Sequence, residues 1–235
     1  MGTDTALTLQ LLGYQTEVIT DKLATDSIDN QQHPEFASLY PSASVIPHSV
    51  YSNQLEPLFR QSQSTFYELR KLSFPGVTIH KHYEVFENDP GRPDYCSWMP
   101  NLQPIDELDP EGIPRRSESS NLFGWAFDCI FADWPLYLPA LANRYSANGG
   151  TISNRTLSAG DITDLPTDTI INCSGTGAPS LFDDPSNRQL LLRGHLLHKA
   201  DAPLISDADN NIVSYNYTPK SSVYADAAGQ PCDVY

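Results

Sequence analysis

Apolar residues recur at helical spacing in two stretches of the first third of the chain. Residues 3–12 combine good helix formers with five apolar positions, and Gly13 follows where a helix commonly ends. Residues 54–72 repeat apolar side chains at helical spacing, and Pro57 is tolerated only because it falls near the first turn. We expect a helix in each stretch and, after the first, a short β-rich strand at residues 17–20.

Other runs carry the pattern of strands. Residues 76–86 alternate between apolar and polar positions, which is typical of a half-buried strand. A helix is expected at 136–145, with Pro139 either in its first turn or at a kink. Asn210 and Asn211 indicate a hairpin turn. The further strands that we expect are 124–131, 151–154, 169–173, 195–199 and 212–217, whereas residues 24–52 predict a long loop and the proline-rich residues 87–120 an irregular excursion or lid.

Composition excludes several classes of function. A chain of 235 residues that is 40% apolar can build one large domain or two small ones with a real core. The 14 basic and 29 acidic residues give a net charge of −15, which disfavours nucleic acid and anionic membranes as partners.

The absence of long apolar runs and the spacing of the cysteines indicate where the protein resides in the cell. No apolar run is long enough to span a membrane, and the first residues do not have the layout of a signal peptide. The four cysteines are far apart, which favours a reducing interior over a zinc knuckle or a disulfide scaffold. We therefore expect a cytoplasmic protein, or a peroxisomal one in a eukaryote, although Asp233, Val234 and Tyr235 carry no peroxisomal address.

The start of the chain resembles the end of a glycine-rich phosphate loop. The segment Gly2-Thr3-Asp4-Thr5-Ala6-Leu7 matches the last glycine of G-x-G-x-x-G and the helix after it, whose free N–H groups can face a pyrophosphate. The expected strand at 17–20 ends at Asp21, and such an acid can accept hydrogen bonds from ribose hydroxyls. The alternative is that Asp21 is an ordinary residue of a turn at the end of a strand.

A second glycine-containing turn follows the expected strand at 169–173. Ser174-Gly175-Thr176-Gly177 would lie at the carboxyl end of a buried strand, where an open α/β sheet leaves a ligand crevice. A glycine there lets the main chain approach a cofactor closely. Arg193-Gly194-His195 adds a donor and another permissive backbone position, and each of these signals alone is weak.

His80 and His82 are spaced to lie on one face of the expected strand 76–86. Such a pair could chelate a metal ion, but no third ligand lies nearby in the sequence, so we favour two solvent-facing histidines and no metal site.

The order of these pieces resembles the D-amino-acid oxidase family, the DAO-type FAD-dependent oxidoreductases. Ile171-Asn172-Cys173-Ser174-Gly175 is close to the family's V-N-C-T-G, Arg193-Gly194-His195 is close to R-G-Q, and residues 2–7 match the family's G-x-x-T-A-L. Residues 38–47 are similar to the flavin-contacting loop, with Ala43-Ser44-Val45 where Ala-Gly-Leu is usual.

The resemblance implies an α/β fold of mixed α+β character, with an incomplete Rossmann-like FAD-binding domain and a substrate domain built on an antiparallel sheet. Residues 1–75 and 151–194 would form the FAD-binding domain, and residues 76–150 and 195–235 the substrate domain. Tyr215 and Tyr217 fall where the family carries substrate-pocket tyrosines, and the resemblance does not decide between them. The implied FAD-binding residues are Gly2, Asp21, Lys22, Ser38, Ala43, Ser44, Val45, Leu157, Cys173, Ser174 and Gly175.

The implied reaction is the oxidation of a D-amino acid to an imino acid, which water releases as a 2-oxo acid and ammonia. Hydride passes to FAD, and oxygen reoxidises the flavin with formation of hydrogen peroxide. No side-chain general base is required, so no catalytic residue is assigned. The implied partners are the D-amino acid and oxygen, without nucleic acid or membrane, and a homodimer is compatible with the family.

The sequence also departs from the family. The first strand and the first two glycines of the fingerprint have no counterpart here, nor do the later strands with the arginine that pairs with the substrate carboxylate. We therefore expect a chain truncated at both ends. The alternatives are a related FAD oxidase of glycine, D-aspartate or another amine, and a non-catalytic fragment or α/β binding protein.

Overall fold

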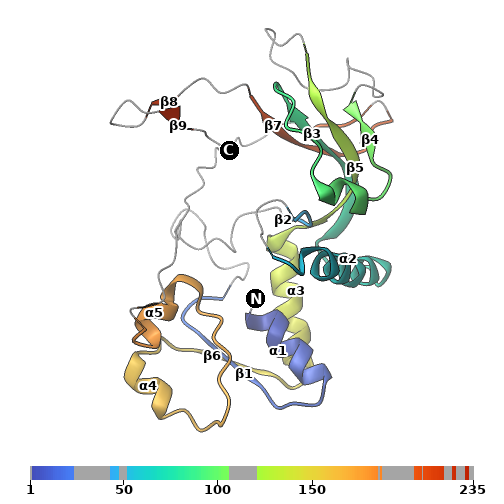
Figure 1. Cartoon of the computed structure of the whole chain (residues 1–235). Coiled ribbons are helices and arrows are strands. Elements are labelled where there is room, and N and C mark those ends of the chain that lie inside the picture. The colour runs from blue at the N-terminus through green and yellow to red at the C-terminus, as the bar shows by residue number, and fades with distance from the viewer. Residues whose placement is uncertain are drawn as a thin grey trace. The chain divides into compact units, whose positions relative to one another are not determined.

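The protein is described by a computed structural model and forms two compact units (Figure 1). The first unit comprises Met1–Pro41 and Asp133–Lys199, and the second comprises Ser42–Ala132 and Ala200–Tyr235. The described residues are 2–23, 43–47, 52–105, 121–184, 186, 204–207 and 209–219, with the backbone alone at 224–225 and 231–232.

The first unit is a small α/β assembly. Strand β1 (Glu17–Thr20) pairs in parallel with β6 (Thr151–Asn154), and helix α1 (Gly2–Leu11) packs on α3 (Trp134–Ala147). These elements confirm the first expected helix and the strands at 17–20 and 151–154. Three short elements complete the unit, namely α4 (Ala159–Thr163), η4 (Gly175–Gly177) and α5 (Ala178–Leu181).

Helix α3 begins earlier than its sequence pattern predicts. It starts at Trp134 with Pro135 in its first turn, so that Pro139 lies inside the helix and not in the first turn. Proline at the first turn is favourable because its φ is already helical and its missing N–H would have no partner there. Near the other end, the fully buried Tyr145 donates its hydroxyl to the carbonyl of Thr16 at 2.6 Å, which ties α3 to the connection before β1.

Residues 169–173 do not form the buried strand that the sequence predicts. This segment is irregular and every side chain in it is exposed, including Ile170 at 41% and Ile171 at 51%. A strand needs a neighbour for its backbone hydrogen bonds, and in the described part of this unit β1 and β6 pair only with each other. In the described residues the segment pairs with neither strand, so its strand-like composition alone does not make it a strand.

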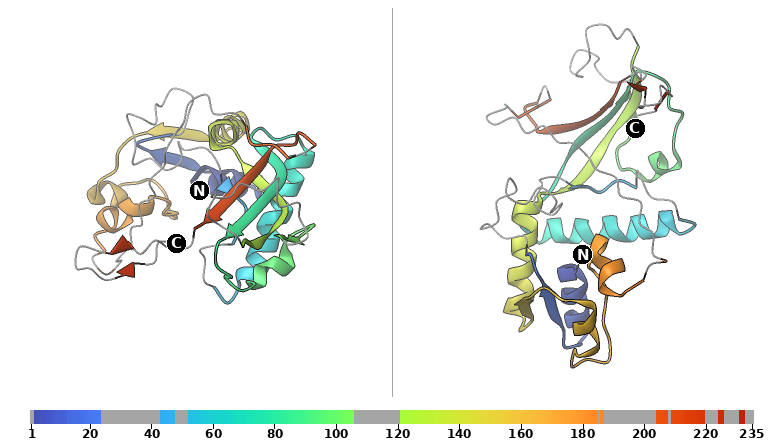
Figure 2. Two further views of the ribbon diagram at one scale, coloured as in Figure 1. Left: turned by 90° about the horizontal axis from the view of Figure 1, so that it is seen from above. Right: turned by 90° about the vertical axis from the view of Figure 1, so that its left-hand side faces the viewer.

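The second unit contains a mixed sheet with strand order β2-β5-β3-β7, with β4 paired to β5 (Figure 2). Strands β3 (Val77–Phe86) and β5 (Phe123–Ala132) run antiparallel over their whole length, whereas β7 (Val213–Thr218) is parallel to β3. The expectation of an antiparallel sheet is therefore corrected to a mixed one. The long connection through the first unit makes this possible, because only antiparallel neighbours can be joined by a tight hairpin.

The remaining elements of this unit are short except for one helix. Helix α2 (Leu55–Lys71) confirms the second expected helix and packs on β3 and β5, although the sequence analysis grouped it with the other domain. The others are β2 (Ala43–Ser44), η2 (Asp94–Trp98), β4 (Gln103–Pro104) and an antiparallel pair, β8 (Tyr224–Ala225) with β9 (Pro231–Cys232).

The sheet of the second unit is covered on both faces. One cluster consists of Phe59, Tyr95, Cys96, Met99, Trp125, Phe127 and Cys129, and the other of Tyr83, Val85, Ile105, Ala126 and Val213. Successive side chains of β3 point to opposite faces, and both sets are buried, with His82 and Glu84 on one face and Tyr83 and Val85 on the other, while β5 and β7 pair with its two edges. Strand β3 is therefore a central strand and not the half-buried strand that its alternation suggests.

Candidate functional site

Several of the residues with implied FAD contacts lie at one edge of the first unit. Because β1 and β6 are parallel, both strands end at the same edge, and Asp21 and Lys22 follow one strand while Leu157 follows the other. The short connection at residues 12–16 turns the chain back from α1 to β1, which brings the start of α1 to this edge. Asp21 is exposed, and Leu157 is partly buried.

The turn at residues 172–175 lies next to the start of α1. A Cβ built on Gly2 would lie 3.5 Å from the Cβ of Cys173, so the two backbones are in close proximity. Asn172 Oδ1 accepts hydrogen bonds from the Ser174 backbone N–H at 3.0 Å and from its hydroxyl at 2.6 Å. These local bonds fix the shape of the turn even though the residues before it form no strand.

Gly175 has the backbone conformation that favours glycine. Its φ is +58°, and a Cβ built on it would meet no atom within 4 Å. There is therefore open space beside the Cα of Gly175.

The first turn of α1 carries one negative charge, which would repel an anion. Asp4 lies in this turn, and its carboxylate accepts a hydrogen bond from the Tyr137 hydroxyl at 3.1 Å. Burial and the neighbouring Asp4 raise the pKa of Tyr137, so its hydroxyl keeps its proton and donates at neutral pH. This hydrogen bond partly offsets the charge, while the free N–H groups at the start of α1 favour an anion.

The other residues with implied FAD contacts belong to the second unit or lie outside the described residues. Ala43 and Ser44 pair with β5 in the second unit, and Val45 donates its N–H to the carbonyl of Ile130 at 2.9 Å. Ser38 lies outside the described residues, as do Arg193-Gly194-His195 and the expected strand 195–199.

Tyr215 and Tyr217 lie on the same face of β7 in the second unit. The ring of Tyr215 stacks on Tyr83 with centroids 4.9 Å apart and an interplanar angle of 17°, while the Tyr217 hydroxyl donates to Glu87 Oε1 at 2.7 Å. Burial, and then the Asp207 carboxylate, raise the pKa of Tyr83, and both also raise that of Tyr215. The stack therefore stays neutral at physiological pH and lies in a negative local potential.

The turn before β7 confirms the expected hairpin turn at Asn210 and Asn211. Ser206 and Ile212 form an antiparallel bridge across it, and Asn210 has a φ of +65°. Asp207 Oδ1 accepts the backbone N–H of Asn211 at 2.8 Å, which closes the turn.

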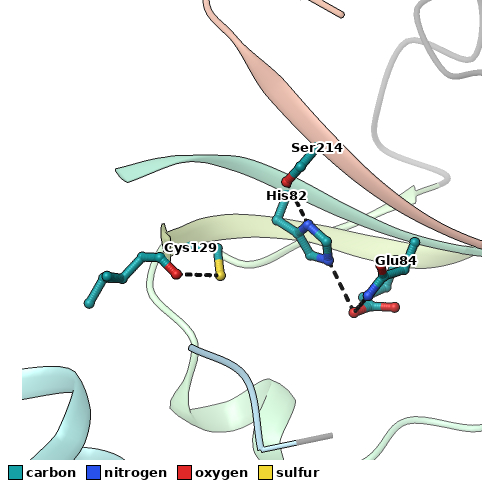
Figure 3. A network of polar contacts seen from close by, with 6 residues as sticks. His82, Glu84, Cys129 and Ser214 are labelled. Atoms are coloured by element: carbon teal, nitrogen blue, oxygen red, sulfur yellow. Dashed lines mark hydrogen bonds and ion pairs between the residues drawn. The ribbon is translucent and has the colours of Figure 1, made fainter. Parts of the chain in front are cut away.

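The prediction of solvent-facing histidines is wrong for His82. His82 is 2% exposed and belongs to a buried polar network with Glu84 and Ser214 (Figure 3). His80 is partly buried and stacks on Phe131 at 3.9 Å, and burial lowers its pKa. Within the described ranges no group of three His, Cys, Asp or Glu side chains is placed to hold a metal ion.

The cysteines differ strongly in expected reactivity. Cys173 is exposed, whereas Cys129 is 1% exposed and burial raises its pKa to about 12. Because the thiolate is the nucleophile, Cys129 would be ionised in about one molecule in ten thousand at pH 8. We expect iodoacetamide to alkylate Cys173 in the folded protein and to leave Cys129 and Cys96 unmodified, as measured by peptide mass spectrometry. Equal labelling of Cys173 and Cys129 would contradict this structure.

Comparison with known proteins gives two relatives whose names bear on this site. The chain is 24% identical to D-aspartate oxidase of Homo sapiens over 229 residues, which cover 91% of this chain and 64% of that protein. It is 35% identical to D-amino-acid oxidase of Rubrobacter xylanophilus over 208 residues, which cover 86% of this chain and 57% of that protein. The chain thus spans about three fifths of the length of these relatives. No family model matches the sequence.

Proposed function

Because this chain is a distant homologue of the D-amino-acid oxidase family over most of its own length, we propose that it takes part in FAD-dependent oxidation of D-amino acids. The observation that carries the proposal is the close approach of Gly2 and Cys173. It brings together two motifs that resemble flavin-contacting segments of this family. The motifs are far apart in sequence, and a chain that had merely kept a family-like composition would have no reason to bring them together.

The residues at the edge of the first unit fit the polar part of FAD. The free N–H groups at the start of α1 are suited to a pyrophosphate, and the exposed Asp21 carboxylate is suited to ribose hydroxyls. The open space beside the Cα of Gly175 allows a close approach of the cofactor. When bound, FAD supplies the acceptor for the substrate hydride, which no side chain can provide.

On the substrate side, we favour Tyr215 over Tyr217 as the pocket tyrosine. The Tyr217 hydroxyl donates to Glu87, whereas the Tyr215 ring is held by stacking on the buried Tyr83 ring. A ring held in this way can orient an amino acid by packing against its side chain. Asp207 lies close enough to affect both rings, and its charge disfavours a substrate with a second carboxylate.

This proposal predicts a preference among substrates. The full chain supplied with FAD should form hydrogen peroxide from D-alanine and more slowly from D-aspartate, with no product from the L-isomers. A peroxidase-coupled dye measures the rate, and omission of FAD is the control. Faster oxidation of D-aspartate would favour the D-aspartate oxidase alternative, and oxidation of the L-isomers alone would contradict the stereochemical part.

Gly175 provides a test of cofactor binding that needs no turnover. The Gly175→Val variant should bind FAD at least about tenfold more weakly, because its side chain would fill the open space beside the turn. Gly149→Val is the matched control, since Gly149 also has a positive φ of +87° and open surroundings but lies before β6, away from the edge. Equilibrium dialysis with FAD measures both variants. Equal affinity in the two would remove Gly175 from the cofactor site.

The rival proposal is a non-catalytic α/β protein that does not bind flavin. Protection of Cys173 separates the two proposals, because the thiol is exposed and lies beside the start of α1. FAD should slow alkylation of Cys173 if it binds at this edge. An unchanged rate at saturating FAD would favour the rival.

A further inference from the structure

A ladder of polar side chains connects β3 to β7 in the second unit, and its members on β3 are buried, whereas Ser214 on β7 is partly buried and Asn216 is exposed (Figure 3). His82 Nδ1 lies 2.7 Å from Ser214 Oγ, and His82 Nε2 lies 3.1 Å from Glu84 Oε1. Asn216 Nδ2 donates to the same carboxylate oxygen at 2.9 Å. His82 and Glu84 are 2% and 1% exposed, in the face of the sheet that also contains Phe127.

The His82 ring bridges the two strands. Its Nδ1 faces Ser214 Oγ on β7 and its Nε2 faces Glu84 Oε1, each nitrogen donating or accepting according to the tautomer. Asn216 Nδ2 donates to the same oxygen of Glu84. The two buried polar side chains on β3, His82 and Glu84, therefore each have a hydrogen-bond partner on β7.

These partners are also register partners in the strand pairing. His82 is opposite Ser214, and Glu84 is opposite Asn216. A slip of β7 by one residue would turn Ser214 and Asn216 to the other face, and a slip by two would place the wrong polar residue opposite Glu84 or His82. Either slip separates His82 from Ser214 and Glu84 from Asn216, so both buried groups lose the hydrogen-bond partners that they have in this register.

The backbone alone fixes this register weakly. Strand β7 has six residues, is parallel to β3 and lies at the end of the strand order. Parallel pairing is slightly less stable per residue than antiparallel pairing, and no tight turn connects β3 to β7. Side-chain contacts must therefore supply the specificity.

We propose that His82 and Glu84 are positioning residues that fix the register of β7 and thereby place Tyr215 against Tyr83. The effect of the register on substrate binding rests on the proposed function, in which Tyr215 faces the substrate. The register of β7 itself does not depend on the proposed function. The stacked pair lies on the opposite face of the same strands, so an error in the polar ladder moves the pocket residue directly.

Disulfide trapping tests the register. Val213→Cys combined with Lys81→Cys forms the in-register pair, and Val213→Cys combined with Ile79→Cys forms a pair displaced by two residues. Because a disulfide tolerates only a narrow range of Cα separations, each pair reports one register. In the otherwise unchanged chain, the in-register pair should give at least about tenfold more disulfide than the displaced pair.

The same two pairs are then placed in a His82→Leu, Glu84→Leu background. Replacing the whole buried pair by apolar residues leaves no unpaired charge and should preserve folding. The proposal predicts that the displaced pair now forms disulfide at a similar rate to the in-register pair. An undiminished preference for the in-register pair in this folded background overturns it.

The conservative variant Glu84→Gln separates positioning from general structural support. The amide oxygen of the new side chain can still accept hydrogen bonds from Asn216 and His82. A chain with Glu84→Gln alone should therefore show the in-register preference that the double leucine variant loses. In a chain that oxidises D-alanine, the double leucine variant should raise KM with FAD affinity unchanged. The trapping experiment needs neither flavin nor substrate. It therefore tests the register of β7 even if the proposed function is wrong.

Discussion

Replacing Gly124 by alanine is expected to destabilise the second unit strongly. Gly124 lies in β5 opposite Val85 and has a φ of +135°, and a Cβ built on it would lie 1.9 Å from the carbonyl oxygen of Glu84. That oxygen belongs to the backbone of the central strand, so it cannot move without breaking the sheet. We expect a loss of at least about 4 kcal/mol in the free energy of unfolding.

Gly91→Ala is the control for this prediction. Gly91 also has a positive φ, +68°, but a Cβ there would meet no atom within 4 Å. We expect it to cost about 1 kcal/mol. Urea unfolding followed by circular dichroism measures both variants, and a Gly124→Ala variant no less stable than Gly91→Ala would show that the two strands are not this close.

Replacing Phe127 by alanine is expected to have the next largest effect. Phe127 is fully buried in β5, within the aromatic cluster that includes Tyr95 and Trp125. Its ring also lies 5.4 Å from that of His82, so the resulting cavity would reach the polar ladder. Removing a buried phenylalanine side chain costs about 3–5 kcal/mol.

Phe182→Ala is the matched control, because Phe182 is 38% exposed and follows the short helix α5 in the first unit. We expect a loss below about 1 kcal/mol there. Chemical denaturation with intrinsic fluorescence can measure both variants. Similar losses in the two would contradict the burial of Phe127.

Local sequence patterns predict most of the regular elements but not their neighbours. The alternation at residues 76–86 gives β3 correctly because strand periodicity is a local property. It cannot show that β7 will lie on one edge of the strand and β5 on the other. For this reason His82 was interpreted as solvent-facing, although Ser214 and Asn216 provide the partners that allow its burial with Glu84.

The same distinction explains the error at residues 169–173. Ile170 and Ile171 have high strand propensity, but a strand forms only where another strand offers hydrogen bonds. The motif at Asn172–Gly175 was nevertheless useful, because the turn itself depends on local bonds from Asn172 to Ser174. Its contact with Gly2 is a tertiary feature. In the sequence, only the resemblance to a family indicated that both segments contact the flavin.

The mixed sheet has a similar origin. Nothing within residues 212–217 distinguishes a parallel from an antiparallel partner, and the sequence pattern correctly predicted only that a strand would form there. Its direction follows from the path of the chain, which passes through the first unit before returning to β3. Among the described residues no helix has the length and apolar character to cross a membrane.

The proposed cofactor site, at the start of α1 and the turn at Ser174 and Gly175, can be tested by the visible absorption spectrum of the chain after incubation with FAD and removal of free cofactor by gel filtration. If FAD binds at this edge, the flavin spectrum should be retained in the unchanged chain, lost in Gly175→Val and kept in Gly149→Val. A colourless protein after incubation with saturating FAD would contradict the proposed site.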